Sequence, residues 1–224
     1  MVVGNPVYRA ALNLSRMVRG LFLFAGGVSL AASLGAAPLA VRVVDGAGHP
    51  VADAVVTLYP SGGAARPARG GSRFVVAQQH LQFHPFLTII PVGADVSFPN
   101  LDPTKHHVYS FSPAKKFELK LFAKDQSRTV HFDKAGVVAL GCNIHDQMSA
   151  FIVVTDSAWT ARTNAQGTAT FADAPSVPGR LTLWHPYLRG VPGGLMTQAV
   201  GPAQRSATFT VRLRPPPAAM AMDY

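Results

Sequence analysis

The sequence contains one cysteine, Cys142, in 224 residues. A lone cysteine cannot form an internal disulfide, so a disulfide framework is excluded and the thiol needs another explanation. Charged residues make up only 14% of the chain and hydrophobic residues 48%, which excludes an intrinsically disordered protein. The 20 glycines and 18 prolines follow no fixed period, so a collagen-like chain is also excluded. A globular protein with a sizeable core is expected.

Acidic residues are missing from the first forty positions. Arg9, Arg16 and Arg19 precede an uncharged run over residues 21–40 that ends in small residues. This pattern predicts a secretory signal peptide over residues 1–37, with an uncleaved membrane anchor as the alternative. The mature protein is then expected in the periplasm, without stable membrane insertion.

Lysine is absent from most of the chain and gathers in one stretch of it. The six lysines are Lys105, Lys115, Lys116, Lys120, Lys124 and Lys134. They form either a solvated strand face or a patch that steers an acidic partner. Nucleic acid is not an expected partner, because no stacking aromatic motif accompanies these lysines and the expected compartment lacks it.

Short runs rich in Val, Thr and Phe are separated by Gly, Asp, Asn or Pro, which predicts many short strands and an all-β fold. Over residues 73–156 such runs recur about every 8 to 12 residues, the spacing of a Greek-key sandwich. Residues 61–72 are mainly Gly, Ala, Arg and Pro, which indicates a linker, and residues 215–224 are expected to form a disordered tail.

The two flanking segments carry a second set of strand signals. DGAGHPVADAVVTL, within residues 39–60, resembles the opening strands of carboxypeptidase-regulatory-like (prealbumin-type) β-sandwiches. TNAQGTATF and PGRLTL, within residues 160–214, resemble their closing strands. Because the ends of a domain usually lie close together, the middle segment can be inserted into a loop of this split sandwich. The alternative is that residues 39–60 supply the first strands of the middle sandwich.

The strongest chemical signal is C-x-x-H-x-x-M, formed by Cys142, His145 and Met148 between two strand-like runs. Cu(I) favours soft sulfur ligands and Cu(II) favours imidazole, so a trigonal site of two His and one Cys with an axial Met suits both oxidation states of copper. Such a site needs one further histidine, which the adjacent pair His106 and His107 can supply. The sequence therefore predicts a copper site.

The segments FPN-x-D, HHVYSFSPAKKFEL and FDKAGVVALGCNIHDQM together resemble the cupredoxins, the type 1 or blue copper proteins. More narrowly, they resemble the periplasmic cupredoxins labelled methylamine utilization proteins, and the gap between His145 and Met148 is similar to the amicyanin ligand loop. The resemblance implies a Greek-key cupredoxin sandwich or barrel with one type 1 copper ion at one end. The implied ligands are His106, Cys142, His145 and Met148.

The resemblance implies His106 rather than His107 as the ligand, because the ligand histidine of the family directly precedes x-V. Many cupredoxins have Asn at the next position, where it ties the two ligand loops together. Here His107 takes that position, so it either supplies the tie or competes as a ligand.

Other interpretations of these residues stay open. Met148 can be plain core filling, and Cys142 can be a nucleophile activated by a histidine, although a thioether has no use in acyl transfer. An enzyme is therefore not expected, and zinc fits less well because its structural sites avoid thioethers. His80 and His84 can form a second, weak metal site, but loop histidines without a ligand role are favoured.

The expected function is electron transfer by cycling between Cu(I) and Cu(II), with a dehydrogenase or a cytochrome as redox partner. An acidic partner surface would suit the lysines. Two alternatives are a copper-binding module for storage, delivery or sensing, and a β-sandwich that binds a partner or a glycan. A link to methylamine oxidation rests on the family label alone.

Overall fold

The computed structural model describes residues 38–62 and 73–215. This part of the chain consists of 17 strands and one three-residue 3-10 helix, Pro192–Gly194, so the expected all-β fold is confirmed. No helix within residues 38–62 or 73–215 has the length and apolar character that crossing a membrane requires. The expected signal peptide over residues 1–37 lies outside the described residues, as do residues 63–72 of the expected linker and residues 216–224 of the expected tail.

The middle segment forms a sandwich of a five-stranded and a three-stranded sheet. The larger sheet has the order β6-β12-β11-β8-β9, formed by β6 (Leu87–Pro91), β12 (Ser149–Thr155), β11 (Gly136–Cys142), β8 (His106–Ser112) and β9 (Lys115–Phe122). The smaller sheet has the order β10-β7-β3, formed by β10 (Ser127–Phe132), β7 (Ala94–Pro99) and β3 (Phe74–Val75). The chain crosses between the sheets after β6, β7, β9 and β10, as expected for a Greek key. A separate hairpin pairs β4 (Ala77–Gln79) with β5 (Gln82–His84).

Alternation along the strands decides which side chains enter the core of this sandwich, because successive side chains point to opposite faces. On β8, His106, Val108 and Ser110 are buried while the residues between them are more exposed. On β11, Val138, Leu140 and Cys142 are the buried positions. Because Cys142 pairs with Val108 in the antiparallel ladder, the last inward position of β11 lies near the first inward position of β8, which is His106. The strand register therefore brings the two predicted ligands to one end of the core.

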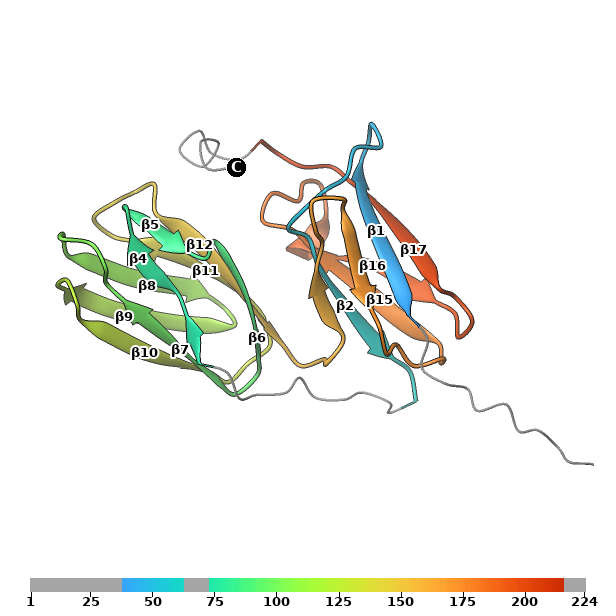
Figure 1. Cartoon of the computed structure of the whole chain (residues 1–224), viewed down its shortest axis with the longest axis horizontal. Coiled ribbons are helices and arrows are strands. Elements are labelled where there is room, and N and C mark those ends of the chain that lie inside the picture. Colours follow the sequence, from blue (N-terminus) through green and yellow to red (C-terminus); the bar gives the residue numbers. More distant parts are fainter. Residues whose placement is uncertain (1–37, 63–72, 216–224) are drawn as a thin grey trace, which may run out of the picture. The chain divides into compact units, whose positions relative to one another are not determined.

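The flanking segments form a second, smaller sandwich with its own core. One sheet has the order β14-β1-β17 and consists of β14 (Thr168–Phe171), β1 (Leu39–Asp45) and β17 (Ser206–Val211). The other has the order β13-β2-β15-β16 and consists of β13 (Thr160–Arg162), β2 (Val55–Pro60), β15 (Gly179–Trp184) and β16 (Met196–Val200). In Figure 1 the blue strand β1 lies beside the red strand β17, with which it pairs in parallel. The strands of residues 39–60 thus pair with strands that follow residue 160.

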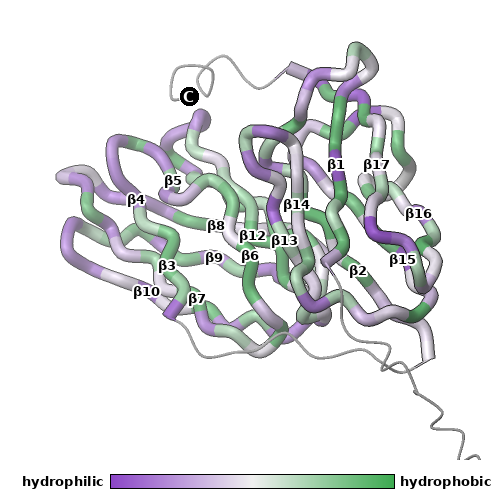
Figure 2. The backbone as a smooth tube through the Cα atoms, turned by 45° about the vertical axis from the view of Figure 1, so that its right-hand side comes forward, coloured by the Kyte–Doolittle hydropathy of each residue, from purple (hydrophilic) through white to green (hydrophobic). Residues whose placement is uncertain are grey.

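Hydrophobic residues concentrate along the strands of both sandwiches, and hydrophilic residues occupy many of the turns (Figure 2). The second sandwich buries aliphatic side chains of β1 and β2 against Phe171, Leu181 and Phe209. The core of the middle sandwich is richer in aromatic residues and includes Phe98 and Phe132. Cys142 belongs to the core of the middle sandwich, so the thiol lies at the edge of a packed apolar core.

Candidate metal centre

Three of the predicted ligands lie together at one end of the middle sandwich. His106 is the first residue of β8, Cys142 is the last residue of β11, and His145 lies in the turn that follows β11. Their candidate ligand atoms all lie within 4.8 Å of one another. The Sγ atom of Cys142 is 3.8 Å from Nδ1 of His106 and 3.6 Å from Nδ1 of His145. Both imidazoles therefore present the same ring nitrogen to one thiol.

These separations fit a first-row metal ion. An ion about 2.1 Å from a nitrogen and about 2.3 Å from a sulfur, with trigonal angles, separates the two donor atoms by about 3.8 Å. The observed distances of 3.6 and 3.8 Å from Cys142 Sγ to the two Nδ1 atoms match this value. Two imidazoles and one thiol are also the donor set that copper favours in trigonal sites. His106, Cys142 and His145 could therefore hold a copper ion without a large rearrangement.

The turn after β11 is held by main-chain hydrogen bonds at both ends. The N–H of Met148 donates to the carbonyl of His145 over 3.0 Å, which closes the turn. The N–H of Asn143 donates to the carbonyl of His107 over 3.1 Å, which ties the turn to the start of β8. The two strands that supply His106 and Cys142 are thus joined at the site as well as along their ladder.

Met148 lies at the end of this turn, and its side chain is only 2% exposed. It belongs to the same core cluster as Cys142. A thioether in that position can pack against the core and also serve as a weak axial ligand, since methionine suits both roles. Its assignment as a ligand stays a prediction.

His107 is directed away from the three donor atoms. Its Nε2 lies 2.9 Å from Oε1 of Glu118 on β9. The alternation of β8 explains this, because the side chains of neighbouring residues point to opposite faces of a strand. The structure therefore places His106, and not His107, beside Cys142. The expected link between the two ligand loops is present. The main-chain carbonyl of His107, and not its side chain, accepts the hydrogen bond from Asn143 that forms this link.

Asp102 is a part of the site to which the sequence analysis assigned no role. Its Oδ2 lies 2.9 Å from Nε2 of His106, and Asp102 is 5% exposed while His106 is fully buried. The carboxylate also accepts hydrogen bonds from the main-chain N–H groups of His80 at 2.6 Å and Leu81 at 3.0 Å. The signal that could have found it is the aspartate of FPN-x-D, which stands four residues before the ligand histidine.

Asn100 fixes the loop that carries Asp102. Its Oδ1 accepts the main-chain N–H of Asp102 at 2.9 Å. Its Nδ2 donates to the carbonyls of Thr104 at 2.8 Å and Phe122 at 3.1 Å. This fully buried amide therefore holds the loop between β7 and β8 in one conformation.

The electrostatics of the pair follow from burial and from these hydrogen bonds. Burial alone would raise the pKa of Asp102, but hydrogen bonds from Leu81, His106 and His80 outweigh it and hold the pKa below its usual value. Burial lowers the pKa of His106, and the neighbouring Asp102 opposes this only in part. An ionised carboxylate beside a neutral imidazole is the combination that a metal-binding histidine requires.

His145 is the predicted ligand that reaches the surface. It lines an open pocket of about 380 Å³ together with Leu81, Asp102, Pro103 and Thr104. Leu101 and Ile144, each 45% exposed, are apolar residues in the two loops that carry Asp102 and His145. The metal centre would therefore be shielded from solvent by the core, with one histidine accessible at its edge.

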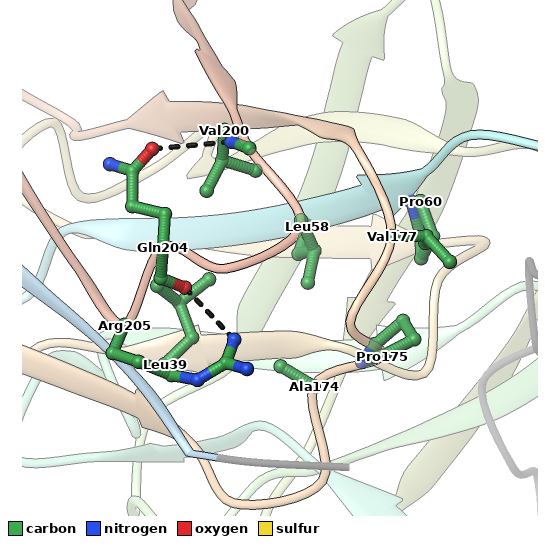
Figure 3. Close-up of a pocket in the computed structure, with 10 residues that line it drawn as sticks. Leu39, Leu58, Pro60, Ala174, Pro175, Val177, Val200, Gln204 and Arg205 are labelled. Carbon is green, nitrogen blue, oxygen red and sulfur yellow. Dashed lines mark hydrogen bonds between the residues drawn. The ribbon is translucent and has the colours of Figure 1, made fainter. Parts of the chain in front are cut away.

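Other candidate sites in the described residues are weaker. Among residues 38–62 and 73–215, the only group of three or more His, Cys, Asp or Glu side chains with metal-binding distances is His106, Cys142 and His145. His80 and His84 belong to no such group. The pocket of the second sandwich in Figure 3 has room for about 10 Å³, the size of one water molecule. At its rim Gln204 accepts the N–H of Gly201 at 3.2 Å, and Arg205 donates to the Gln204 carbonyl.

Comparisons with protein-family models and with curated proteins gave no match. A copper-containing nitrite reductase from Thermus scotoductus SA-01 is similar at 23% identity and a TM-score of 0.37, covering 43% of this chain and 25% of the reductase chain. The reduced Cu(I) form of an amicyanin mutant is similar at 20% identity and a TM-score of 0.35, covering 44% of this chain and 99% of the amicyanin chain. A purple cupredoxin from Nitrosopumilus maritimus is similar at 19% identity and a TM-score of 0.34, covering 37% of this chain and 99% of that chain. At these identities and TM-scores the likeness does not decide which residues bind a metal.

Proposed function

We propose that this chain is a type 1 copper protein of the cupredoxin kind that carries electrons by cycling between Cu(I) and Cu(II). The observation that carries the proposal is the convergence of one thiol and one nitrogen from each of two imidazoles within 4.8 Å. His106, Cys142 and His145 would hold the ion, with Met148 as a further, weaker donor. The bound copper would supply the one-electron redox chemistry.

The surroundings of the donors favour electron transfer over other uses of copper. Two ligands stand on paired strands, and main-chain hydrogen bonds hold the third in a closed turn. Such a framework resists rearrangement, so one geometry would serve both oxidation states and keep the cost of reorganisation low. A storage or delivery module would instead benefit from a site that opens.

His145 is the proposed point of electron exchange, because it is the ligand beside the open pocket. The lysines of the middle sandwich suit an acidic partner, for which a dehydrogenase or a cytochrome of the periplasm is the proposed class. The exposed lysines are Lys105, Lys116, Lys120, Lys124 and Lys134. If they steer the partner, the association rate falls as salt is added.

The test is to load the purified protein with Cu(II) and record its visible spectrum and its voltammogram. The proposal predicts one copper ion, an intense thiolate-to-copper band that is lost in Cys142→Ser, and reversible one-electron reduction. A copper adduct without this band would contradict the type 1 site. A coloured but redox-silent adduct would support the alternative of a copper module for storage, delivery or sensing.

A further inference from the structure

We propose that Asp102 is a positioning residue that holds His106 as an Nδ1 ligand and lowers the reduction potential of the copper ion. This inference rests on the proposed copper function, which it deepens by naming a residue that sets the properties of the site. It concerns a carboxylate that would not itself touch the metal.

The neighbours of the His106 ring decide which of its two nitrogens carries the hydrogen. Its Nε2 faces the Asp102 carboxylate at 2.9 Å, while its Nδ1 faces the Cys142 thiol at 3.8 Å. An ionised carboxylate can only accept hydrogen bonds, so Nε2 must carry the hydrogen. The lone pair of Nδ1 is then directed toward Cys142, where the metal would bind. Asp102 thus selects the tautomer of His106 that can act as a ligand.

Asp102 is kept in place by the turn of a neighbouring hairpin. The turn between β4 and β5 consists of His80 and Leu81, whose φ angles of 55° and 59° are left-handed although neither residue is glycine. Residues other than Gly, Asn, Asp and His rarely adopt this conformation, so Leu81 is the unusual residue of the turn. It lets two consecutive N–H groups of the turn donate to one carboxylate. Such strain is typical of sites where a particular geometry is needed.

The negative charge of Asp102 would also affect the bound copper ion. Asp102 and His106 are both buried, and within residues 38–62 and 73–215 the carboxylate has no positively charged side chain among its hydrogen-bond partners. A negative charge at this distance is weakly screened in the protein interior. It would make the imidazole a stronger donor and stabilise Cu(II) relative to Cu(I). The result would be a lower reduction potential than His106 alone would give.

The test compares Asp102→Asn with a matched control, Asp95→Asn. Asp95 also pairs with a histidine, His131, at 2.8 Å, but both residues are exposed. Asp102→Asn removes the buried charge at nearly constant volume and should weaken the preference for Cu(II) over Cu(I) by about tenfold, a rise in potential of ~59 mV. Asp95→Asn should leave the potential close to that of the wild type. An unchanged or lower potential in Asp102→Asn would overturn the inference.

A second measurement needs no copper. Nitrogen-15 NMR of the metal-free protein should show His106 with hydrogen on Nε2 in the wild type, and mixed tautomers in Asp102→Leu, whose side chain cannot accept a hydrogen bond. The same tautomer in both proteins would contradict the role of Asp102. If Asp102→Asn does not fold, Asp102→Glu can be measured in its place. This variant keeps the charge, so its reduction potential and the tautomer of its His106 should both stay close to those of the wild type.

The two proposals can fail separately. If the wild type gives no thiolate-to-copper band, the proposed function fails, while the NMR measurement still tests whether Asp102 orients His106. If the wild type binds copper as expected, but Asp102→Asn leaves the potential unchanged and Asp102→Leu leaves the tautomer unchanged, only the inference about Asp102 fails.

Discussion

The main-chain N–H of Asn143 donates a hydrogen bond to the carbonyl oxygen of His107 over 3.1 Å. The residue after Cys142 is thereby joined to the residue after His106. His107 contributes its backbone to the site, while its ring pairs with Glu118 on the other side of β8. The two adjacent histidines therefore have separate roles.

Substitution of the two histidines should give different results. We expect His106→Ala to lower the Cu(II) affinity by more than about 100-fold, because a ligand is lost from a three-donor site. His107→Gln should retain the affinity within about threefold, since its ring only contacts an exposed carboxylate. Competition titration against a chelator measures both. An equal loss in the two variants would show that His107 is also a ligand.

Two glycines of the second sandwich should differ in their tolerance of a side chain. Gly48 and Gly167 both have left-handed φ angles, 87° and 68°. A Cβ on Gly48 meets nothing within 4 Å, whereas one on Gly167 would lie 2.5 Å from the Val43 carbonyl and 2.9 Å from the Val51 nitrogen. Gly48→Ala should lower the free energy of unfolding by about 1 kcal/mol. Gly167→Ala should cost about 2 kcal/mol more, because the backbone must move. Equal midpoints in urea would contradict the close approach at Gly167.

The turn that holds Asp102 should be improved by a residue that tolerates its conformation. Leu81 is 37% exposed and has a φ of 59°, so it gives up little burial if replaced. Leu81→Asn should raise the free energy of unfolding by about 0.5 to 1 kcal/mol, since asparagine accepts the left-handed region. Leu101→Asn is the control, because Leu101 is 45% exposed and has no positive φ. A similar rise in the free energy of unfolding of Leu101→Asn would show that relief of backbone strain at Leu81 does not explain the gain.

The stability of the metal-free protein should fall in mild acid. Burial lowers the pKa of His185, and the Ala52 carbonyl and Asp53 oppose this only in part. The unfolded chain therefore takes up a proton below about pH 6.5, while the folded chain resists it. The free energy of unfolding then decreases as the pH falls from about 6.5 toward the lowered pKa, and it is insensitive to this group above that range.

Urea unfolding at about pH 7.5 and about pH 5.5 measures this slope. His185→Asn keeps an acceptor for the N–H of Tyr187, which His185 Nδ1 binds at 3.1 Å, but it cannot take up a proton. This variant should lose less stability between the two pH values than the wild type does. His106, whose pKa burial also lowers, would account for part of the remaining slope. An unchanged slope in His185→Asn would show that this residue does not cause it.

Some parts of the site could be predicted from the sequence because they depend on local spacing. Cys142 and His145 stand three residues apart in one turn, so C-x-x-H is sufficient to bring them together. The preference for His106 over His107 rests on resemblance, and the alternation of β8 gives a physical reason for it. Sequence spacing alone does not decide the role of Met148, because a buried thioether beside the turn can either pack in the core or bind the metal.

Other parts depend on contacts that the sequence does not encode locally. Asp102 meets the turn at His80 and Leu81, 22 and 21 residues earlier in the chain. That turn contains neither Gly nor Asn, so its left-handed conformation leaves no sequence signal. The parallel pairing of β1 with β17 joins Ala40 to Ser206, and no local pattern predicts a pairing over such a distance. The all-β class was predictable because short runs rich in Val, Thr and Phe recur between turn residues along the chain.

X-ray absorption at the copper edge of the protein loaded with one equivalent of Cu(II) tests the copper site most directly. We predict a first coordination shell with two nitrogen donors and one short sulfur donor, and loss of that sulfur in Cys142→Ser. A shell of nitrogen and oxygen alone in the wild type would contradict the claim that His106, Cys142 and His145 form one copper site.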